Sequence, residues 1–109
     1  MKGVKMKVFI SQPMNGLSEE EILGNRDRAI KYLKKTYGED VDIIDSYFGD
    51  NITIEATNEP AYYLGKSIEM MADADLVFFA KGWKKARGCC IEEKVASEYG
   101  IARKYEEEK

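Results

Sequence analysis

The chain has 109 residues, 17 basic and 20 acidic, a net charge of -3 and an apolar fraction of 44%. Its length fits one domain, and its composition is that of a globular chain. Because basic and acidic residues are interspersed, the sequence does not favour a polymeric nucleic acid as partner. Without an apolar run near the roughly 20 residues of a membrane-spanning helix, we expect no membrane partner.

The chain contains no histidine, which narrows its possible chemistry. Ser-His-Asp and Cys-His catalysis and nearly all catalytic zinc sites are excluded, so carboxylate chemistry becomes the leading option. The two cysteines, Cys89 and Cys90, are adjacent, and we expect no structural zinc site. We predict no metal and no cofactor. With no signal-peptide pattern at the start, these features favour the cytoplasm.

The first half of the chain predicts a strand, a loop, a helix and a second strand. Apolar residues predict the first strand over residues 4–10, and a turn-rich loop covers residues 11–16. The helix begins at the capping box formed by Ser18 and Glu21 and ends before Gly38. The second strand is expected over residues 41–45.

A polar connection over residues 46–59 is long for so small a domain. It carries Tyr47 and Phe48. These rings either form a wall or lid for a ring-shaped ligand or simply pack beneath the connection.

The second half of the chain repeats the alternation of helices and strands. Its predicted elements are a helix from Pro60 to about Ala72, a strand over residues 76–80, a helix over residues 88–99, and a weak edge strand over residues 101–105 with residues 105–109 as a frayed tail. The whole pattern predicts one α/β domain over residues 1–109. We expect a small doubly wound, Rossmann- or flavodoxin-like fold, with a mainly parallel sheet of four to five strands and helices on both faces.

In such a fold the carboxyl ends of the strands share one crevice, where ligands bind. The crevice would gather the loop over residues 11–16, Asp45 with Tyr47, and the loop from Gly82 to Gly88. Helix N-termini at this edge favour an anion such as phosphate, and Arg87 would add a charge-assisted hydrogen bond. The chain has neither a Walker loop nor a GxGxxG motif, which disfavours P-loop hydrolysis and dinucleotide binding.

Glu92 is the candidate nucleophile. It lies about one turn into the last helix, with the small Ala96 four residues later on the same face, and this spacing leaves room for a sugar ring. Glu93 points about 100° away, towards solvent. An acidic residue near a helix N-terminus is also a common stabiliser of the helix, so position alone leaves both interpretations open.

Three other residues allow two interpretations. Trp83 either stacks on a base or covers the edge of the sheet. Cys89 is more simply explained as a small side chain that packs at a tight helix start than as a nucleophile. A helix N-terminus nevertheless lowers the pKa of a thiol, so a reactive Cys89 is the second interpretation. Ser67 is predicted to be solvated or weakly packed.

The motifs Lys7-Val8-Phe9-Ile10-Ser11-Gln12-Pro13-Met14-Asn15-Gly16, Ala74-Asp75-Leu76-Val77-Phe78-Phe79 and Gly82 to Glu92 resemble the DUF4406 family. That family is similar to the nucleoside 2-deoxyribosyltransferase superfamily, which includes deoxynucleoside 5′-monophosphate N-glycosidases. The resemblance runs from the first strand to Gly100. It implies a single domain of the deoxyribosyltransferase type.

The resemblance also implies roles for individual residues. Glu92 matches the nucleophilic glutamate that attacks the anomeric carbon and forms a covalent glycosyl-enzyme, and the nearby Ala96 is kept. Arg87 and Gly88 match the loop that meets the 5′ end of the sugar or its phosphate. The implied substrate-binding residues are Ser11, Gln12, Pro13, Met14, Asn15, Gly16, Asp45, Tyr47, Trp83, Arg87 and Gly88.

The chain departs from the superfamily pattern at two positions. Ser67 stands where the enzymes carry an aspartate, which leaves Asp45 as a substitute acid for the departing base. Ala86 stands where nucleotide hydrolases carry a phosphate-binding serine, so phosphate recognition would rest on Arg87 and backbone N–H groups.

Together these features lead us to expect an N-glycosidase or deoxyribosyltransferase acting on a nucleoside or nucleoside 5′-monophosphate. The alternative is a binding protein that holds a nucleotide or a nucleotide-derived signal in the same pocket without turnover. The expected partners are this small molecule and further copies of the chain, as a homo-oligomer whose sites are completed across the interface.

Overall fold

A computed structural model describes residues 5–44 and 56–106. The elements in chain order are β1 (Lys7–Ser11), α1 (Glu19–Tyr37), β2 (Asp42–Ile43), α2 (Glu59–Met71), β3 (Leu76–Phe79), the 3-10 helix η1 (Trp83–Lys85), α3 (Arg87–Glu98) and β4 (Ala102–Tyr105). The predicted alternation of strands and helices is confirmed. Among the described residues no helix is long and apolar enough to cross a membrane.

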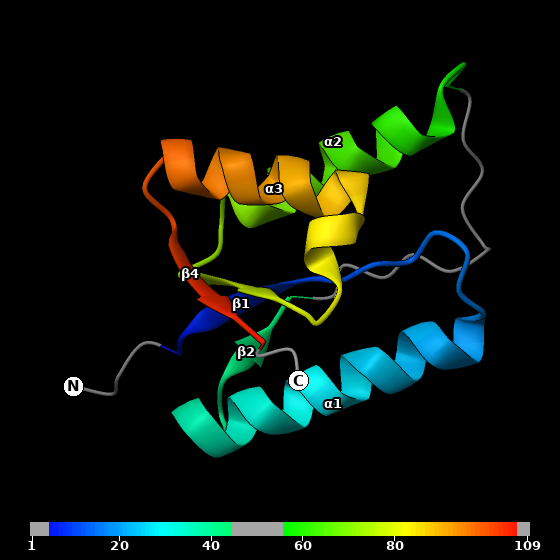
Figure 1. The fold of residues 1–109 in the computed structure, drawn as a ribbon. Helices are drawn as coiled ribbons and strands as arrows, with labels where there is room; N and C mark the ends of the chain where they lie inside the picture. The colour runs from blue at the N-terminus through cyan, green and yellow to red at the C-terminus, as the bar shows by residue number, and fades with distance from the viewer. Residues whose placement is uncertain (1–4, 45–55, 107–109) are drawn as a thin grey trace.

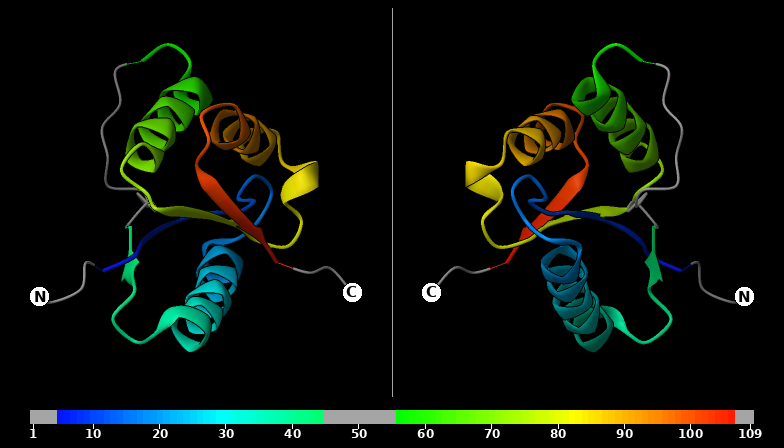
Figure 2. Two further views of the ribbon diagram at one scale, coloured as in Figure 1. Left: turned by 90° about the vertical axis from the view of Figure 1, so that its left-hand side faces the viewer. Right: turned by 90° about the vertical axis from the view of Figure 1, so that its right-hand side faces the viewer.

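The four described strands form one parallel sheet in the order β2-β1-β3-β4 (Figure 1). Helix α1 covers one face of the sheet, and α2 and α3 lie together on the other face (Figure 2). This arrangement confirms the predicted α/β class, with helices on both faces. Strand β4 is at an edge, as predicted, and all four of its residues are exposed.

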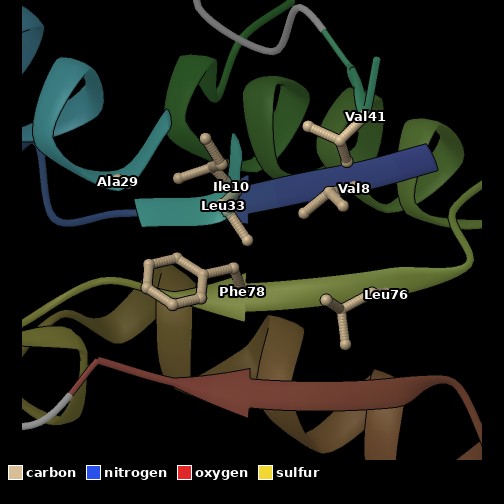
Figure 3. Close-up of a cluster of buried hydrophobic side chains, with 7 residues drawn as sticks. All are labelled: Val8, Ile10, Ala29, Leu33, Val41, Leu76 and Phe78. Atoms are coloured by element: carbon tan, nitrogen blue, oxygen red, sulfur yellow. The ribbon is translucent and has the colours of Figure 1, made fainter. Parts of the chain in front are cut away.

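The alternation of side chains along the two central strands builds a separate core on each face of the sheet. The core under α1, shown in Figure 3, consists of Val8, Ile10, Ala29, Leu33, Val41, Leu76 and Phe78. The core under α2 and α3 consists of Phe9, Met71, Val77, Phe79 and Ala96. Because β1 and β3 are buried on both faces, their sequences are almost continuously apolar.

The helix ends follow the signals in the sequence. Ser18 caps α1 and forms the predicted capping box with Glu21. Helix α2 begins one residue before Pro60 because the side chain of Asn58 accepts a hydrogen bond from the N–H of Ala61. No side chain caps α3.

Several predicted boundaries need correction. Strand β1 extends to Ser11, and β2 is limited to two residues, Asp42 and Ile43. Residues 83–85 form a 3-10 helix where the sequence predicts only a loop. Two residues assigned to the tail are also placed: Tyr105 belongs to β4, and Glu106 accepts hydrogen bonds from Arg28 and from the N–H of Lys81.

Candidate active site

The carboxyl ends of the central strands β1 and β3 lie side by side, and their loops meet. Ser11 is in register with Phe79, and the N–H of Ala80 donates to the Ser11 carbonyl at 2.8 Å. Gly82 has a φ of +90°, and a Cβ at this position would lie 3.4 Å from Pro13. This left-handed backbone suits glycine, and it lets the loop after β3 approach the loop after β1.

A cavity of about 610 Å³ opens where these loops meet the first turns of α2 and α3. Its volume is within the range of small-molecule sites. Its lining residues are Phe9, Ile10, Ser11, Gln12, Pro13, Met14, Asn15, Leu17, Pro60, Tyr63, Leu64, Ser67, Gly82, Lys85, Ala86, Arg87, Gly88, Cys89 and Glu92. The cavity therefore lies at the predicted crevice.

Glu92 is the buried carboxylate of this cavity, with 7% of its surface exposed. Cys89, Glu92 and Ala96 are the buried residues of α3, and their spacing of three and four places them on the face towards the sheet. Ser11, at the end of β1, donates a hydrogen bond from Oγ to Glu92 Oε1 at 2.5 Å. A charge-assisted hydrogen bond of this kind orients the carboxylate.

Ser67 of α2 also lies near Glu92 and lowers the pKa of its carboxyl. It is half-buried and lines the cavity, which agrees with the predicted solvated or weakly packed serine and adds a place in the site. One signal in the sequence was available: Ser67 is four residues before Met71, which is fully buried, and such residues share a helix face.

The environment of Glu92 acts on its protonation in two directions. Burial raises the pKa of the Glu92 carboxyl above its ordinary value, because the charged form loses its hydration. The hydrogen bond from Ser11 and the nearby Ser67 hydroxyl lower this pKa and offset part of the effect. Buried carboxyl groups with perturbed pKa values, facing a cavity, are characteristic of functional sites.

Cys89 lies beside Glu92 but has the properties of a structural residue. It is 4% exposed, and burial raises the pKa of its thiol to about 12. The expectation that the helix N-terminus lowers this pKa is therefore not met, because burial has the larger effect. Cys90 points outward, and its Sγ donates to the carbonyls of Trp83 and Lys84.

The two ends of the cavity differ in chemistry. Lys85 and Arg87 border it at the start of α3, where no side chain caps the helix. This end suits an anionic group, because helix N-termini and cations both attract negative charge. Lys85 was not among the predicted site residues.

Apolar side chains line other parts of the cavity. Met14 and Leu17 come from the segment before α1, and Pro60, Tyr63 and Leu64 come from α2. Leu17, Tyr63 and Leu64 were not among the predicted site residues. The place of Tyr63 and Leu64 in the site depends on the packing of α2 beside α3, which local sequence does not reveal.

The structure brings together most of the predicted site residues. Ser11, Gln12, Pro13, Met14, Asn15, Arg87, Gly88 and Glu92 all border the cavity. Gly16, with a φ of +82°, follows the lining residues of its loop but does not border the cavity. Asp45 and Tyr47, like Phe48, lie outside the described residues.

Trp83 lies away from this cavity. Its ring packs against Phe79 and Tyr105, with centroids 5.3 Å apart in both pairs. Of its two predicted roles, this packing corresponds to covering the edge of the sheet. It borders a separate cavity of about 550 Å³ with Lys84, Tyr105 and Glu106.

The sequence predicts that Glu93 points towards solvent, but in the structure this residue also has partners within the protein. Its carboxylate accepts a hydrogen bond from the Tyr105 hydroxyl at 2.8 Å and lies near Arg103.

Within residues 5–44 and 56–106, no group of three or more histidine, cysteine, aspartate or glutamate side chains is arranged to hold a metal ion.

The chain matches the model of the family described as "Domain of unknown function (DUF4406)" over residues 6–105. This match covers most of the chain, and the chain therefore belongs to that family. The match by itself shows membership of this family and does not show membership of the nucleoside 2-deoxyribosyltransferase superfamily. Neither the curated proteins nor the solved structures compared with the chain show a match.

Proposed function

We propose that this DUF4406 protein is an N-glycosidase or 2-deoxyribosyltransferase that acts on a nucleoside or nucleoside 5′-monophosphate, with Glu92 as its nucleophile. One observation carries the proposal: the buried Glu92 carboxyl lines a cavity of substrate size and accepts a hydrogen bond from the Ser11 hydroxyl at the end of β1. The resemblance to the nucleoside 2-deoxyribosyltransferase superfamily supports the same assignment.

The reaction proceeds in two displacements at the anomeric carbon. A Glu92 carboxylate oxygen attacks this carbon, and the bond to the base nitrogen breaks with its electron pair leaving on the base, which takes up a proton. Water then attacks the glycosyl-enzyme, releases Glu92 and loses a proton, so that sugar and free base are the products. If a second base attacks in place of water, the outcome is transfer.

The two ends of the cavity fit the two ends of such a substrate. Lys85, Arg87 and the uncapped start of α3 suit a 5′-phosphate. The apolar side chains of Met14, Leu17 and Tyr63 suit the faces of a base. Glu92 borders the same cavity and can meet the sugar.

The test compares Glu92→Gln with Glu98→Gln, an exposed glutamate on the same helix. Purified protein is incubated with a panel of deoxynucleosides and their 5′-monophosphates, and free base is measured by chromatography. We expect Glu92→Gln to reduce base release by at least about 10³-fold, and Glu98→Gln to stay within about twofold. If base release survives in Glu92→Gln, the assignment of Glu92 as nucleophile is wrong.

The alternative function is binding without turnover. It is favoured by the serine at position 67, where the similar enzymes carry an aspartate, because this leaves no obvious acid to protonate the departing base. Calorimetry with the same panel, followed by recovery of the ligand, separates the two functions. Tight binding with unchanged ligand supports the alternative, whereas measurable turnover contradicts it.

The proposal includes a homo-oligomer in the cytoplasm. Ile91 on α3 and Tyr99 directly after this helix are exposed hydrophobic residues that would suit contact with another copy. Sedimentation analysis at several protein concentrations tests this association. The unpaired Cys89 and Cys90 fit a reducing compartment.

A further inference from the structure

Glu106, the residue directly after β4, is a carboxylate that the chemistry at Glu92 does not use. It accepts two hydrogen bonds from the guanidinium of Arg28 on α1, from Nε to Oε2 at 2.7 Å and from Nη2 to Oε1 at 3.1 Å. Its side chain is 18% exposed. A two-pronged contact of this kind fixes both the position and the orientation of the carboxylate.

The same residue holds the start of the loop that leads from β3 to α3. Glu106 Oε1 accepts a hydrogen bond from the backbone N–H of Lys81 at 2.7 Å, and the N–H of Glu106 donates to the carbonyl of Phe79 at 2.8 Å. The Trp83 ring of the loop also packs against Tyr105, the residue before Glu106. The loop is therefore anchored from the side of β4 as it leaves the sheet.

Internal hydrogen bonds connect this anchor to the far end of the loop. The N–H of Trp83 donates to the carbonyl of Ala80, and the N–H of Ala86 donates to the carbonyl of Trp83, both at 3.1 Å. Lys85 and Arg87, on either side of Ala86, border the cavity. Among the described residues neither forms an ion pair, so the backbone of the loop sets where these two cations lie.

We propose that Glu106 is a positioning residue of the candidate active site: by joining the loop after β3 to α1, it places Lys85 and Arg87 for the phosphate of a nucleoside 5′-monophosphate. This inference rests on the proposed function, because it concerns the anionic end of the same substrate. Glu106 does not border the cavity that contains Glu92, so it acts through the loop and touches no reacting atom.

Glu106 has two opposite effects on a phosphate bound at this end of the cavity. Its negative charge repels the phosphate, although the pairing with Arg28 and the surrounding solvent weaken this repulsion. Its hydrogen bonds favour the phosphate, because a loop that is already ordered loses less freedom when the ligand binds. Removing the carboxylate would therefore tighten phosphate binding if only its charge mattered, and weakens phosphate binding if its anchoring role is the larger effect.

The experiment measures dissociation constants by calorimetry in the Glu92→Gln background, so that turnover does not consume the probes. The probes are deoxyadenosine 5′-monophosphate and deoxyadenosine, which differ only in the phosphate. We expect Glu106→Ala to weaken binding of the monophosphate roughly 5- to 20-fold and to leave binding of deoxyadenosine within about twofold. The control is Glu98→Ala, which removes the same charge from an exposed pair with Lys94 on α3 and should leave both constants within about twofold.

Arg28→Ala is the second variant, and it also tests the inference if Glu106→Ala fails to fold. It removes the contact with α1 but leaves the hydrogen bond between Glu106 and Lys81, so the loss of monophosphate binding should be smaller. If Arg28 acts only through Glu106, the double variant should bind the monophosphate no more weakly than Glu106→Ala alone. Losses that add would show two independent effects and would contradict the anchor.

Hydrogen exchange measures the loop without any ligand. The amides of residues 81–86 should exchange faster in Glu106→Ala, while those of β1 keep their rates. Unchanged or tighter binding of the monophosphate in Glu106→Ala, or an equal loss for both probes, would overturn the inference. If neither probe binds in the Glu92→Gln background, the proposed function fails, and hydrogen exchange alone decides whether Glu106 positions the loop: unchanged rates over residues 81–86 would overturn this role, whereas faster exchange confined to them supports it.

Discussion

Ser11 Oγ lies 2.5 Å from Glu92 Oε1, and this hydrogen bond joins residues that are 81 positions apart in the chain. It connects the end of the central strand β1 to α3. Ser11 is 2% exposed and Glu92 7% exposed, so the contact is shielded from water. In these surroundings the hydroxyl both orients the carboxylate and sets how readily it ionises.

The two serines should control the acid limb of the pH profile. Ser11 and Ser67 each lower the pKa of Glu92, so Ser11→Ala and Ser67→Ala should raise it further. Because the nucleophile must be ionised, the acid limb of kcat/KM should move to higher pH in both variants. We also expect kcat/KM at low pH to fall roughly 10- to 100-fold.

Profiles of base release between pH 4 and pH 9 check this prediction, with Ser97→Ala as the control, since Ser97 is exposed on α3 and away from the cavity. A uniform loss of activity with an unmoved acid limb would show that the serines only maintain the shape of the site.

Glu92 should also make stability depend on pH in a characteristic direction. Burial raises its pKa in the folded state above the ordinary value of 4.5, so the folded protein binds this proton more tightly than the unfolded chain. The stabilisation is fully present below pH 4.5 and is lost as pH rises through the folded-state pKa. Glu92→Gln removes the titrating group. The free energy of unfolding of this variant minus that of the unaltered protein should therefore be larger at pH 7 than at pH 4.

Urea unfolding of both proteins across this pH range measures the difference between their free energies of unfolding. The comparison cancels the other carboxylates, including Glu106, whose pKa is lowered by hydrogen bonds from Arg28 and Lys81 against the effect of burial. A difference that does not change with pH would contradict the burial of an ionisable Glu92.

The two cysteines should differ strongly in reactivity. With a pKa of about 12, Cys89 would be ionised in only about one molecule in 10⁴ at pH 8, and it is also buried. Cys90 is exposed. We expect iodoacetamide at pH 8 to label Cys90 at least about tenfold faster than Cys89, as measured by mass spectrometry of peptides from Cys89→Ala and Cys90→Ala variants. Equal rates would mean that the start of α3 opens readily.

The loss of stability on shortening a side chain of α1 should depend on which face of the helix the residue occupies. Leu33 is fully buried against the sheet, whereas Leu23 is 44% exposed on the same helix. Leu33→Ala should reduce the free energy of unfolding by about 2–5 kcal/mol, because it removes packed atoms and leaves a cavity. Leu23→Ala should cost less than about 1 kcal/mol. Chemical denaturation of both variants tests this prediction, and similar losses would contradict the packing of α1.

The sequence predicted the order of elements because the signals for each element are local. The Ser18–Glu21 capping box, the apolar run of β3 and the spacing of Glu92 and Ala96 could each be interpreted within a few residues. Features that depend on partners from elsewhere in the chain could not be predicted. Ser67 and Tyr63 line the cavity because α2 packs beside α3, and the sequence of α2 alone does not show this.

Sequence alone thus determined the α/β pattern, and it predicted Glu92 as the candidate nucleophile from its position and from the absence of histidine. Only the tertiary structure decided which groups surround that carboxylate: Ser11 as hydrogen-bond donor, Ser67 near it on α2, and Lys85 in the lining of the same cavity. It also separated Trp83 from the cavity and joined Glu106 to the loop after β3. The physical reason is that periodicity records which face of an element is buried, whereas hydrogen bonds and pKa values depend on side chains that meet across elements distant in the chain.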